Sequence, residues 1–275
     1  MDAALVEKYQ LLQDYLGQFE SSITAFSGGV DSSLVAYVAA GKLGARALAI
    51  TSGSSSLKRS DLKLTVELAE KWGMQHRVIV TDELSKPEYR ENPTNRCFHC
   101  KTSLYVALAQ IAQSEGYDKV FNGTNCDDLG DHRPGLVAAK NHDVGAPLVE
   151  AGFRKADVRA LAAHLGLENA EKPQAACLSS RFPYGTHIDE AKLAQVERAE
   201  EALASFGFTQ FRVRHHEDVA RLELLPEEFA LAIEKRGEIE TAIKGCGYRF
   251  VALDLSGFRS GSLNEGIVEL VNLPS

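Results

Sequence analysis

The chain has 275 residues, of which 44% are hydrophobic and 25% are charged, so one large or two smaller domains with a substantial core are possible. Its formal net charge of -8 argues against a broad basic surface, and we expect no nucleic-acid partner. No apolar run reaches membrane-spanning length, and the first residues lack a secretory signal pattern. We therefore expect no membrane association and a cytoplasmic location, where the five cysteines stay reduced.

Over the first two thirds of the chain, short apolar runs alternate with segments of helical periodicity. Helices are expected over 4–19, 32–40, 58–73, 101–115 and 155–166, and strands over 23–26, 46–51, 76–80 and 119–125. This alternation predicts an α/β fold in which helices cover both faces of a parallel sheet.

The pattern changes after about residue 190. A helix is expected over 190–206, strands over 211–215 and 220–224, a helix over 226–245 and a strand over 248–255. Such an order is typical of a small α+β unit. We therefore predict a Rossmann-like first domain over 1–188 and a smaller C-terminal α+β domain over 189–275.

The first polar turn, Ser27-Gly28-Gly29-Val30-Asp31-Ser32, joins the first strand to the next helix. Glycines let the backbone approach a ligand, and the free N–H groups of a helix N-terminus favour phosphate. Ser33 continues the row of hydroxyl donors. No lysine follows the glycines, so the turn is not a Walker A loop. It resembles the pyrophosphate loop (PP-loop) of ATP pyrophosphatases, although a glycine turn of this kind can also serve only as a connection.

Two further polar turns, 51–56 and 122–128, follow the second and fourth expected strands. The carboxyl ends of parallel strands meet at one edge of a sheet, where ligands bind. Gly123 and Thr124 are therefore candidates for nucleotide contact. Asp127 or Asp128 could meet Mg²⁺, which prefers oxygen ligands near phosphates, or could simply belong to a solvated turn.

The cysteines permit several interpretations. Cys97 and Cys100 form a C-x-x-C pair, and Cys177 lies far away in the sequence. A structural zinc site would need a fourth ligand such as His99 or Cys126. A redox dithiol would use only the pair. A [4Fe–4S] cluster held by three cysteines would leave one iron open, and a pair with no metal or redox role is the remaining alternative.

Arginines gather in the C-terminal third. Arg212 and Arg214 alternate, so a strand would place both on one face, where they would suit phosphate or carboxylate. Arg181 and Arg259 could join them. The alternative is an ordinary solvated strand face.

Together these stretches resemble the LarE family of PP-loop enzymes, and the likeness runs through nearly the whole chain. The motifs that carry it are the PP-loop, Asn122-Gly123-Thr124-Asn125, Asp131-His132-Arg133-Pro134-Gly135, the helix from Lys155 to Gly166, Ser179-Ser180-Arg181-Phe182-Pro183-Tyr184-Gly185, Arg212-Val213-Arg214 and Gly257-Phe258-Arg259-Ser260-Gly261. The resemblance implies an adenine nucleotide alpha hydrolase-like fold. It also implies an ATP-dependent sulfurtransferase in the biosynthesis of the nickel-pincer nucleotide cofactor.

In that family ATP adenylates a carboxylate of pyridinium-3,5-biscarboxylic acid mononucleotide, pyrophosphate leaves, and sulfur then displaces AMP. The resemblance assigns a role to each group of candidate residues. Those implied to bind ATP are Ser27, Gly28, Gly29, Val30, Asp31, Ser32, Ser33, Thr51, Ser52, Gly123 and Thr124, and those implied to bind the mononucleotide are Ser180, Arg181, Arg212, Arg214 and Arg259. The implied catalytic residues are Asp31, Lys155, Arg159 and Cys177. Of these, Lys155 and Arg159 would assist the departure of pyrophosphate. Asp31 and Asp128 are the implied Mg²⁺ ligands.

The resemblance leaves two sulfur sources. One branch of the family sacrifices a cysteine at the position of Cys177, whereas this chain looks like the branch in which Cys97, Cys100 and Cys177 hold a [4Fe–4S] cluster. The second source requires a sulfide donor. Family members assemble as hexamers, so a homo-oligomer is expected. The rival functions are tRNA thiolation, amide formation by a PP-loop ligase, and ATP binding by a regulatory module with structural zinc.

Overall fold

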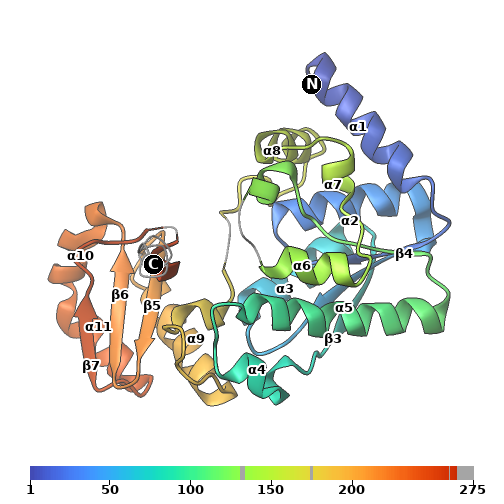
Figure 1. Cartoon of the computed structure of the whole chain (residues 1–275). Coiled ribbons are helices and arrows are strands. Elements are labelled where there is room, and N and C mark those ends of the chain that lie inside the picture. Colours follow the sequence, from blue (N-terminus) through green and yellow to red (C-terminus); the bar gives the residue numbers. More distant parts are fainter. Residues whose placement is uncertain (131–133, 174–175, 260, 265–275) are drawn as a thin grey trace, which may run out of the picture. The chain divides into compact units, whose positions relative to one another are not determined.

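The computed structural model describes residues 1–130, 134–173, 176–259 and 261–264. The chain forms two compact units (Figure 1). The first comprises residues 1–86 and 95–175, and the second comprises residues 87–94 and 176–275. Residues 87–94 and 176–188, which the sequence would place in the first domain, thus lie in the second compact unit. No helix of the described residues is long and apolar enough to cross a membrane.

A four-stranded parallel sheet forms the centre of the first unit. Its strand order is β3 (Gln75–Ile79), β2 (Ala47–Ser52), β1 (Ser22–Ala25) and β4 (Lys119–Phe121). Each of these strands was expected from an apolar run in the sequence. The α/β class with a parallel sheet is confirmed.

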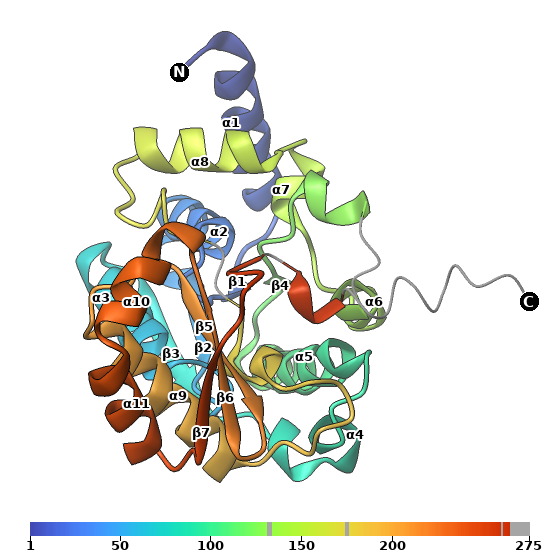
Figure 2. The same ribbon diagram turned by 90° about the vertical axis from the view of Figure 1, so that its left-hand side faces the viewer.

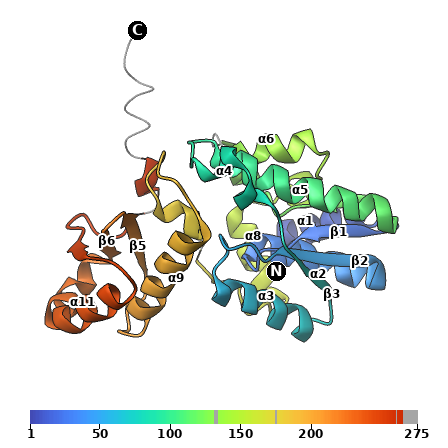
Figure 3. The same cartoon turned by 90° about the horizontal axis from the view of Figure 1, so that it is seen from below.

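Helices cover both faces of this sheet because successive side chains of a strand point to opposite sides. Ile23 and Ile50 pack beneath α5 (Arg96–Glu115) and α6 (Pro134–Asn141). Ala49 faces the other way, toward α2 (Val30–Leu43) and α3 (Arg59–Lys71). Figure 3 shows the two helical layers on either side of the strands.

A further helical layer covers α2. It consists of α1 (Ala3–Leu16), α7 (Pro147–Glu150) and α8 (Lys155–His164), whose apolar residues share one core cluster with α2. Nine of the fourteen residues of α2 are buried. The helix that follows the glycine turn is therefore held from two sides, which gives its N-terminus a fixed position relative to the strand ends.

The second unit is built on a three-stranded sheet in the order β5 (Phe211–His216), β6 (Val219–Leu224) and β7 (Phe250–Leu253). β5 and β6 are antiparallel, and β6 and β7 are parallel. The helices α9 (Glu190–Ala204), α10 (Phe229–Glu234) and α11 (Arg236–Gly245) contribute apolar residues to the core of this sheet. Figure 2 shows the strands and helices of this unit. A smaller C-terminal domain with a mixed sheet is confirmed.

One expected helix is wrong in its extent. The continuous helix predicted over 226–245 is a short 3-10 turn followed by α10 and α11, because the backbone leaves the helical conformation at Lys235, with ψ of 11°. Three short helices escaped the sequence analysis, namely α4 (Pro87–Arg90), α6 and α7. Such elements of four to eight residues carry too few turns to show a hydrophobic period.

Segment 87–94 joins the second unit through hydrogen bonds to the run that begins at Ser179. The hydroxyls of Tyr89 and Ser179 lie 2.5 Å apart, and both side chains are buried. The side-chain amide of Asn92 donates to the carbonyl of Pro183 at 2.7 Å. The backbone carbonyl of Asn92 accepts from the N–H of Gly185 at 2.9 Å. These contacts link residues about ninety positions apart, a distance at which sequence patterns carry no information.

Candidate functional site

The PP-loop lies between β1 and α2 in the first unit, and its own serines close it. Gly28 has φ of +71°, a conformation that favours glycine, and Gly29 caps α2. Ser32 donates from its hydroxyl to the carbonyl of Gly29 at 3.1 Å. The hydroxyl oxygen of Ser32 also accepts from the backbone N–H of Ser27 at 3.2 Å. The loop thus presents the free N–H end of a mostly buried helix, which is a suitable site for an anion.

The turn after β4 presses directly against the first turn of α2. A Cβ atom at Gly123 would lie 2.5 Å from the backbone nitrogen of Ser32 and 2.8 Å from the carbonyl carbon of Asp31. Real Cβ atoms do not approach backbone so closely, so only glycine fits here. Two of the polar turns that the sequence places at strand ends are therefore in contact in the structure.

Asp31, in the first turn of α2, has two charged or polar partners from distant segments. Lys155 Nζ lies 2.5 Å from Asp31 Oδ2, and Asn125 Nδ2 donates to Asp31 Oδ1 at 3.1 Å. Asp128 accepts the backbone N–H of Asn125 at 3.1 Å, so both aspartates that the resemblance assigns to Mg²⁺ lie around one asparagine. The lysine and the aspartate together provide a positive and a negative group at the helix N-terminus.

Asp127 has a different task. Its carboxylate accepts the backbone N–H of Lys155 at 2.8 Å and pairs with the side chain of Arg154 at 3.2 Å. A carboxylate at the N-terminus of a helix interacts favourably with the helix dipole. Asp127 thereby ties the turn after β4 to the first residue of α8 and helps to place Lys155.

At the end of β2, the hydroxyl of Thr51 is already bonded. It donates to the carbonyl of Phe26 at 2.7 Å and lies 2.9 Å from His76 Nε2. Because a carbonyl can only accept, the threonine proton is committed to it and His76 Nε2 must donate. Burial lowers the pKa of His76, which favours this neutral tautomer. Ser52 shares a hydrogen bond of 2.7 Å with Thr81. Contact of these two residues with adenosine stays a prediction.

Lys155 and Arg159 do not act on the same group in the structure. Lys155 contacts Asp31 at the PP-loop, whereas Arg159 donates to the carbonyls of Ala170 at 2.8 Å and Lys172 at 3.1 Å. Although one helical turn separates the two residues, their side chains hold different segments. Of this pair, only Lys155 contacts a residue of the PP-loop turn.

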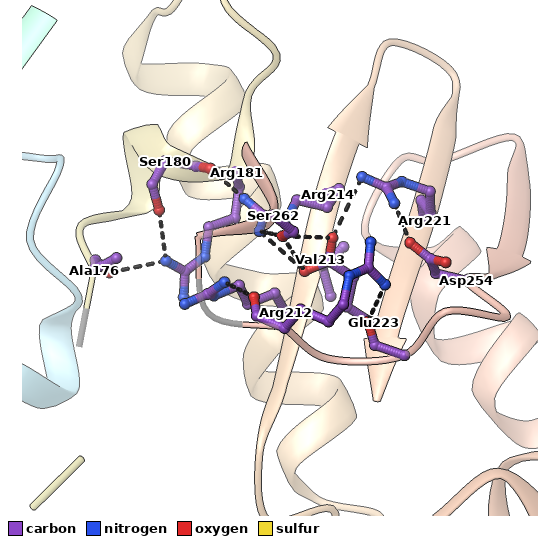
Figure 4. A network of polar contacts seen from close by, with 12 residues as sticks. Ala176, Ser180, Arg181, Arg212, Val213, Arg214, Arg221, Glu223, Asp254 and Ser262 are labelled. Atoms are coloured by element: carbon purple, nitrogen blue, oxygen red, sulfur yellow. Dashed lines mark hydrogen bonds and ion pairs between the residues drawn. The ribbon is translucent and has the colours of Figure 1, made fainter. Parts of the chain in front are cut away.

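In the second unit, charged side chains line the face of the sheet that α9 and α11 leave uncovered. Glu223 is fully buried, and its carboxylate lies 3.0 Å from Arg214 Nη2 and 3.3 Å from Arg221 Nη2. Ser262 accepts from Arg214 at 2.6 Å (Figure 4). Because Arg214 pairs with Arg221 across β5 and β6, alternation places Arg214, Arg221 and Glu223 on one face of the sheet.

Arg181 is buried in a second ion pair rather than presented to a ligand. Its Nε and Nη2 donate to Glu200 at 2.8 and 3.1 Å. Its Nη1 donates to the carbonyls of Ala176 at 2.8 Å and Cys177 at 3.2 Å, and to the Ser180 hydroxyl at 2.9 Å (Figure 4). Every guanidinium nitrogen therefore has a partner within the protein, and the side chain holds the turn that begins at Cys177.

Arg212 differs from these two arginines. No carboxylate among the described residues lies within ion-pair distance of it; instead it donates to the carbonyl of Arg259 at 3.0 Å and stacks 4.6 Å from the ring centre of Phe258. Burial, and then the charges of Arg214 and Arg181, lower its pKa. Glu223 and Glu200 act in the opposite direction but are smaller contributions, so a bound anion would further stabilise this half-buried positive charge.

None of the five cysteines forms a disulfide bond in the structure. Cys97 and Cys100 lie in the first turns of α5, exposed and half-buried respectively, and Cys177 precedes the 3-10 turn Leu178–Arg181. Thiols are the donors that an iron–sulfur cluster requires. No group of three or more His, Cys, Asp or Glu side chains within the described parts of the chain is arranged to hold a metal ion. The pair is present as predicted, but a complete metal site is not shown.

The sequence analysis missed several residues that organise these regions. Glu200 and Glu223 neutralise the buried arginines, and Asn125 and Asn169 hold the first turn of α2 and the PP-loop. Glu223 had no signal, since it occupies a regular polar position in the alternation of β6 and reads as a solvated residue. Asn125 belongs to a motif of the family resemblance but had no role assigned to it, and Asn169 had no signal at all, because a polar residue in a turn is the ordinary case. Residues 131–133 and Ser260, which belong to motifs of the family resemblance, lie outside the described residues.

Comparisons with known proteins cover nearly the whole chain. An uncharacterized protein of Synechocystis sp. is 42% identical over 95% of this chain and 98% of its own length. The pyridinium-3,5-bisthiocarboxylic acid mononucleotide synthase of Lactiplantibacillus plantarum is 36% identical over 97% of each chain. An uncharacterized protein of Methanocaldococcus jannaschii is 29% identical over 86% of this chain and 90% of its own length. Residues 5–95 also match the NAD synthase family model.

Proposed function

We propose that this chain, which belongs to the LarE family of PP-loop enzymes, converts pyridinium-3,5-biscarboxylic acid mononucleotide to a thiocarboxylate in nickel-pincer cofactor biosynthesis. It is an ATP-dependent, sulfur-inserting synthase of that family. The observation that carries the proposal is the end-to-end similarity to the Lactiplantibacillus plantarum synthase. The PP-loop with Asp31 and Lys155, and the arginine face with Arg212, supply anion-binding chemistry of the kind that two phosphorylated substrates need.

Adenylation is the first proposed step. A carboxylate oxygen of the mononucleotide attacks the α-phosphorus of ATP, the bond between the α-phosphorus and the bridging oxygen breaks, and pyrophosphate leaves with the electron pair. The N–H groups at the start of α2 and the ammonium of Lys155 stabilise the negative charge that develops on the leaving group. Asp31 keeps Lys155 in place and is the proposed Mg²⁺ ligand, with Asp128 as the weaker candidate. ATP is thus assigned to the first unit.

Recognition of the mononucleotide is assigned to the second unit. Arg212 has no carboxylate partner among the described residues, so it is the arginine best suited to the substrate phosphate or a carboxylate. Arg214 carries one partner charge in Glu223, and we assign it a supporting contact together with Arg259 and Ser180. Arg181 is no longer proposed as a direct contact, because its nitrogens already donate to Glu200, to backbone carbonyls and to Ser180.

Sulfur transfer follows adenylation. A sulfur nucleophile adds to the acyl carbon, the bond from that carbon to the AMP oxygen breaks, and AMP leaves with the electron pair. The product is a thiocarboxylate. Cys177 is the proposed catalytic cysteine, and the backbone around it is held because its carbonyl accepts from Ser180 at 3.0 Å and from Arg181.

Two sources of the sulfur atom are compatible with a catalytic Cys177. In the first, the thiols of Cys97, Cys100 and Cys177 would hold a [4Fe–4S] cluster, which supplies sulfide when it is bound and is renewed by a sulfide donor. In the second, the thiolate of Cys177 displaces AMP to form a thioester; a base then removes the α-proton of Cys177, the Cβ–S bond breaks with its electron pair staying on sulfur, and the products are the thiocarboxylate and dehydroalanine. Assembly as a homo-oligomer, a hexamer in the family, remains a prediction.

The test combines turnover with metal analysis. Protein purified anaerobically is assayed for iron, acid-labile sulfide and zinc, then incubated with ATP and the mononucleotide while AMP, pyrophosphate and thiocarboxylate are measured. About four irons per chain, lost in Cys177→Ala, would support the cluster. Retained pyrophosphate release without thiocarboxylate in Cys177→Ala would support the assigned role. No pyrophosphate release by the native enzyme would contradict the proposal.

An amide-forming PP-loop ligase is the second candidate, because residues 5–95 match the NAD synthase family model. Such an enzyme attacks the acyl-adenylate with ammonia rather than sulfur. Replacing the sulfide source with ammonium in the same assay separates the two reactions. Formation of a carboxamide at a rate above that of thiocarboxylate would favour the ligase.

A further inference from the structure

A segment that follows α8 supports the PP-loop from its buried side. Asn169 is 4% exposed, and its side-chain amide donates to the carbonyl of Gly28 at 2.9 Å and to the hydroxyl of Ser33 at 2.7 Å. The two acceptors lie more than 130 positions away in the sequence and flank the N-terminus of α2. Gly28 accepts only through its carbonyl, so the nitrogen of the amide must face it.

Both donors of the Asn169 amide are therefore engaged with the PP-loop and the first turn of α2. Its oxygen is buried and has no hydrogen-bond partner among the described residues. Leaving a buried acceptor without a partner has a free-energy cost. The two hydrogen bonds donated by the Asn169 amide nitrogen thus form although the amide oxygen remains without a partner among the described residues.

The contact with Gly28 determines the direction of the next N–H group. In a trans peptide the C=O of one residue and the N–H of the following residue point in opposite directions, and the described chain has no cis peptide bond. Asn169 draws the carbonyl of Gly28 toward the protein interior. The N–H of Gly29 must then point away from Asn169, where it makes only a long hydrogen bond of 3.4 Å to the hydroxyl of Ser27. Gly29 is half-exposed, so a ligand oxygen can take the place of that weak acceptor.

The segment that carries Asn169 is itself held in place. Arg159 donates to the carbonyls of Ala170 and Lys172, the residues just after the asparagine. Lys172 forms an ion pair of 2.8 Å with Asp61 in the first turn of α3, and both side chains are largely buried. The segment that carries Asn169 is therefore held by Arg159 of α8 and by Asp61 of α3.

We propose that Asn169 is a positioning residue for ATP, which holds the Gly28–Gly29 peptide so that its N–H faces the pyrophosphate portion of the nucleotide, and that Arg159 acts through it. This role rests on the use of ATP by the enzyme and not on the identity of the sulfur acceptor. It replaces the direct contact of Arg159 with pyrophosphate that the family resemblance implies.

Asn169→Asp tests the proposal, because it preserves the shape of the side chain and removes both donors. The affinities of the purified full-length chain for ATP, pyrophosphate and AMP are measured by titration calorimetry. We expect ATP and pyrophosphate to bind about tenfold more weakly, the effect of losing a hydrogen bond that orients a charged ligand, while AMP stays within about twofold. Asn169→Ala, which introduces no charge, should show the same selectivity, and it replaces the first variant if that one does not fold.

Two matched variants sharpen the result. Glu168→Gln changes the adjacent residue, whose side chain pairs with Lys71 and Trp72 and not with the loop, so the ratio of ATP to AMP affinity should not change. Arg159→Lys keeps the charge but cannot donate to the carbonyls of Ala170 and Lys172 at the same time. It should lower the affinities for ATP and pyrophosphate by about threefold.

Equal weakening of all three ligands by the Asn169 variants would show a general structural role and overturn the proposal. Unchanged binding of ATP and pyrophosphate would overturn it as well. Failure of the native chain to bind any nucleotide would instead contradict the ATP-dependent function itself.

Discussion

The two units arrange buried polar groups around an anion-binding region by different physical means. In the first unit, neutral donors hold the PP-loop: Asn169 bonds Gly28, and the serines of the loop bond one another. In the second, buried charges hold one another: Arg181 pairs with Glu200, and Arg214 with Glu223. A backbone loop carries only dipoles, so amides suffice to orient it, whereas a buried guanidinium needs a counter-charge.

This difference explains why the arginine motif was harder to interpret than the glycine motif. In the PP-loop the ligand-binding groups are backbone N–H groups, which belong to the turn itself. On the arginine face, three similar side chains have three different sets of partners, and of the three only Arg212 has no carboxylate of the described residues within ion-pair distance. Equal residue types therefore do not imply equal roles.

The largest effect is expected where a buried charge loses its partner. Arg181→Met removes the guanidinium that neutralises the buried Glu200, and should lower the free energy of unfolding of the second unit by about 3–5 kcal/mol. Denaturant unfolding followed by circular dichroism measures it. Lys63→Met, which breaks an exposed pair with Glu67 on α3, should change stability by less than about 1 kcal/mol. Similar values for both variants would show that the buried pair is not a structural requirement.

Arg212→Gln should affect ligand binding more than folding. We expect the mononucleotide to bind about ten- to a hundredfold more weakly, because a charge-assisted contact is lost, while ATP affinity stays unchanged. Calorimetric titration with each ligand separates the two. Arg249→Gln, at an arginine that stacks on Phe250 near β7, is the control and should leave both affinities unchanged. Weaker ATP binding in Arg212→Gln would contradict the assignment of the two ligands to separate units.

Gly123→Ala tests the contact between the turn after β4 and α2. The added methyl would lie 2.5 Å from a backbone nitrogen that cannot easily move, so we expect a loss of about 1–3 kcal/mol and weaker ATP binding. Gly41→Ala is the matched control in α2 itself, since its Cβ meets nothing within 4 Å. There alanine should stabilise the helix by about 0.5–1 kcal/mol. Normal stability of Gly123→Ala would mean that the turn can move away without cost.

The smallest effect concerns pH. Burial lowers the pKa of His76 in the first unit and of His215 in the second, so both are less easily protonated in the folded chain than in the unfolded one. The unfolded state then binds more protons as pH falls below about 6.5, and the stability present above that pH is gradually lost. His76→Gln and His215→Gln should each flatten the pH dependence of the denaturant midpoint between about pH 5 and 7. A steeper dependence would reverse the sign inferred for these histidines.

The sequence by itself determined the succession of the strands and of the longer helices in both units, and the position of the PP-loop between β1 and α2. Hydrophobic periodicity and glycine placement are local properties, and the residues that produce them lie close together in the chain. The C-x-x-C pair and the alternating arginines were recognisable for the same reason. Sequence alone could also show that Arg212 and Arg214 share one face of a strand.

Only the tertiary structure decided which of these side chains already have partners. Asn169 and Gly28, or Arg181 and Glu200, are brought together by the packing of elements that no short pattern connects. The positioning roles proposed for Arg159 and Arg181 rest on such contacts, because a guanidinium can serve a ligand or a buried carbonyl equally well. A residue type states which bonds are possible, and the folded chain selects among them by placing a partner within reach.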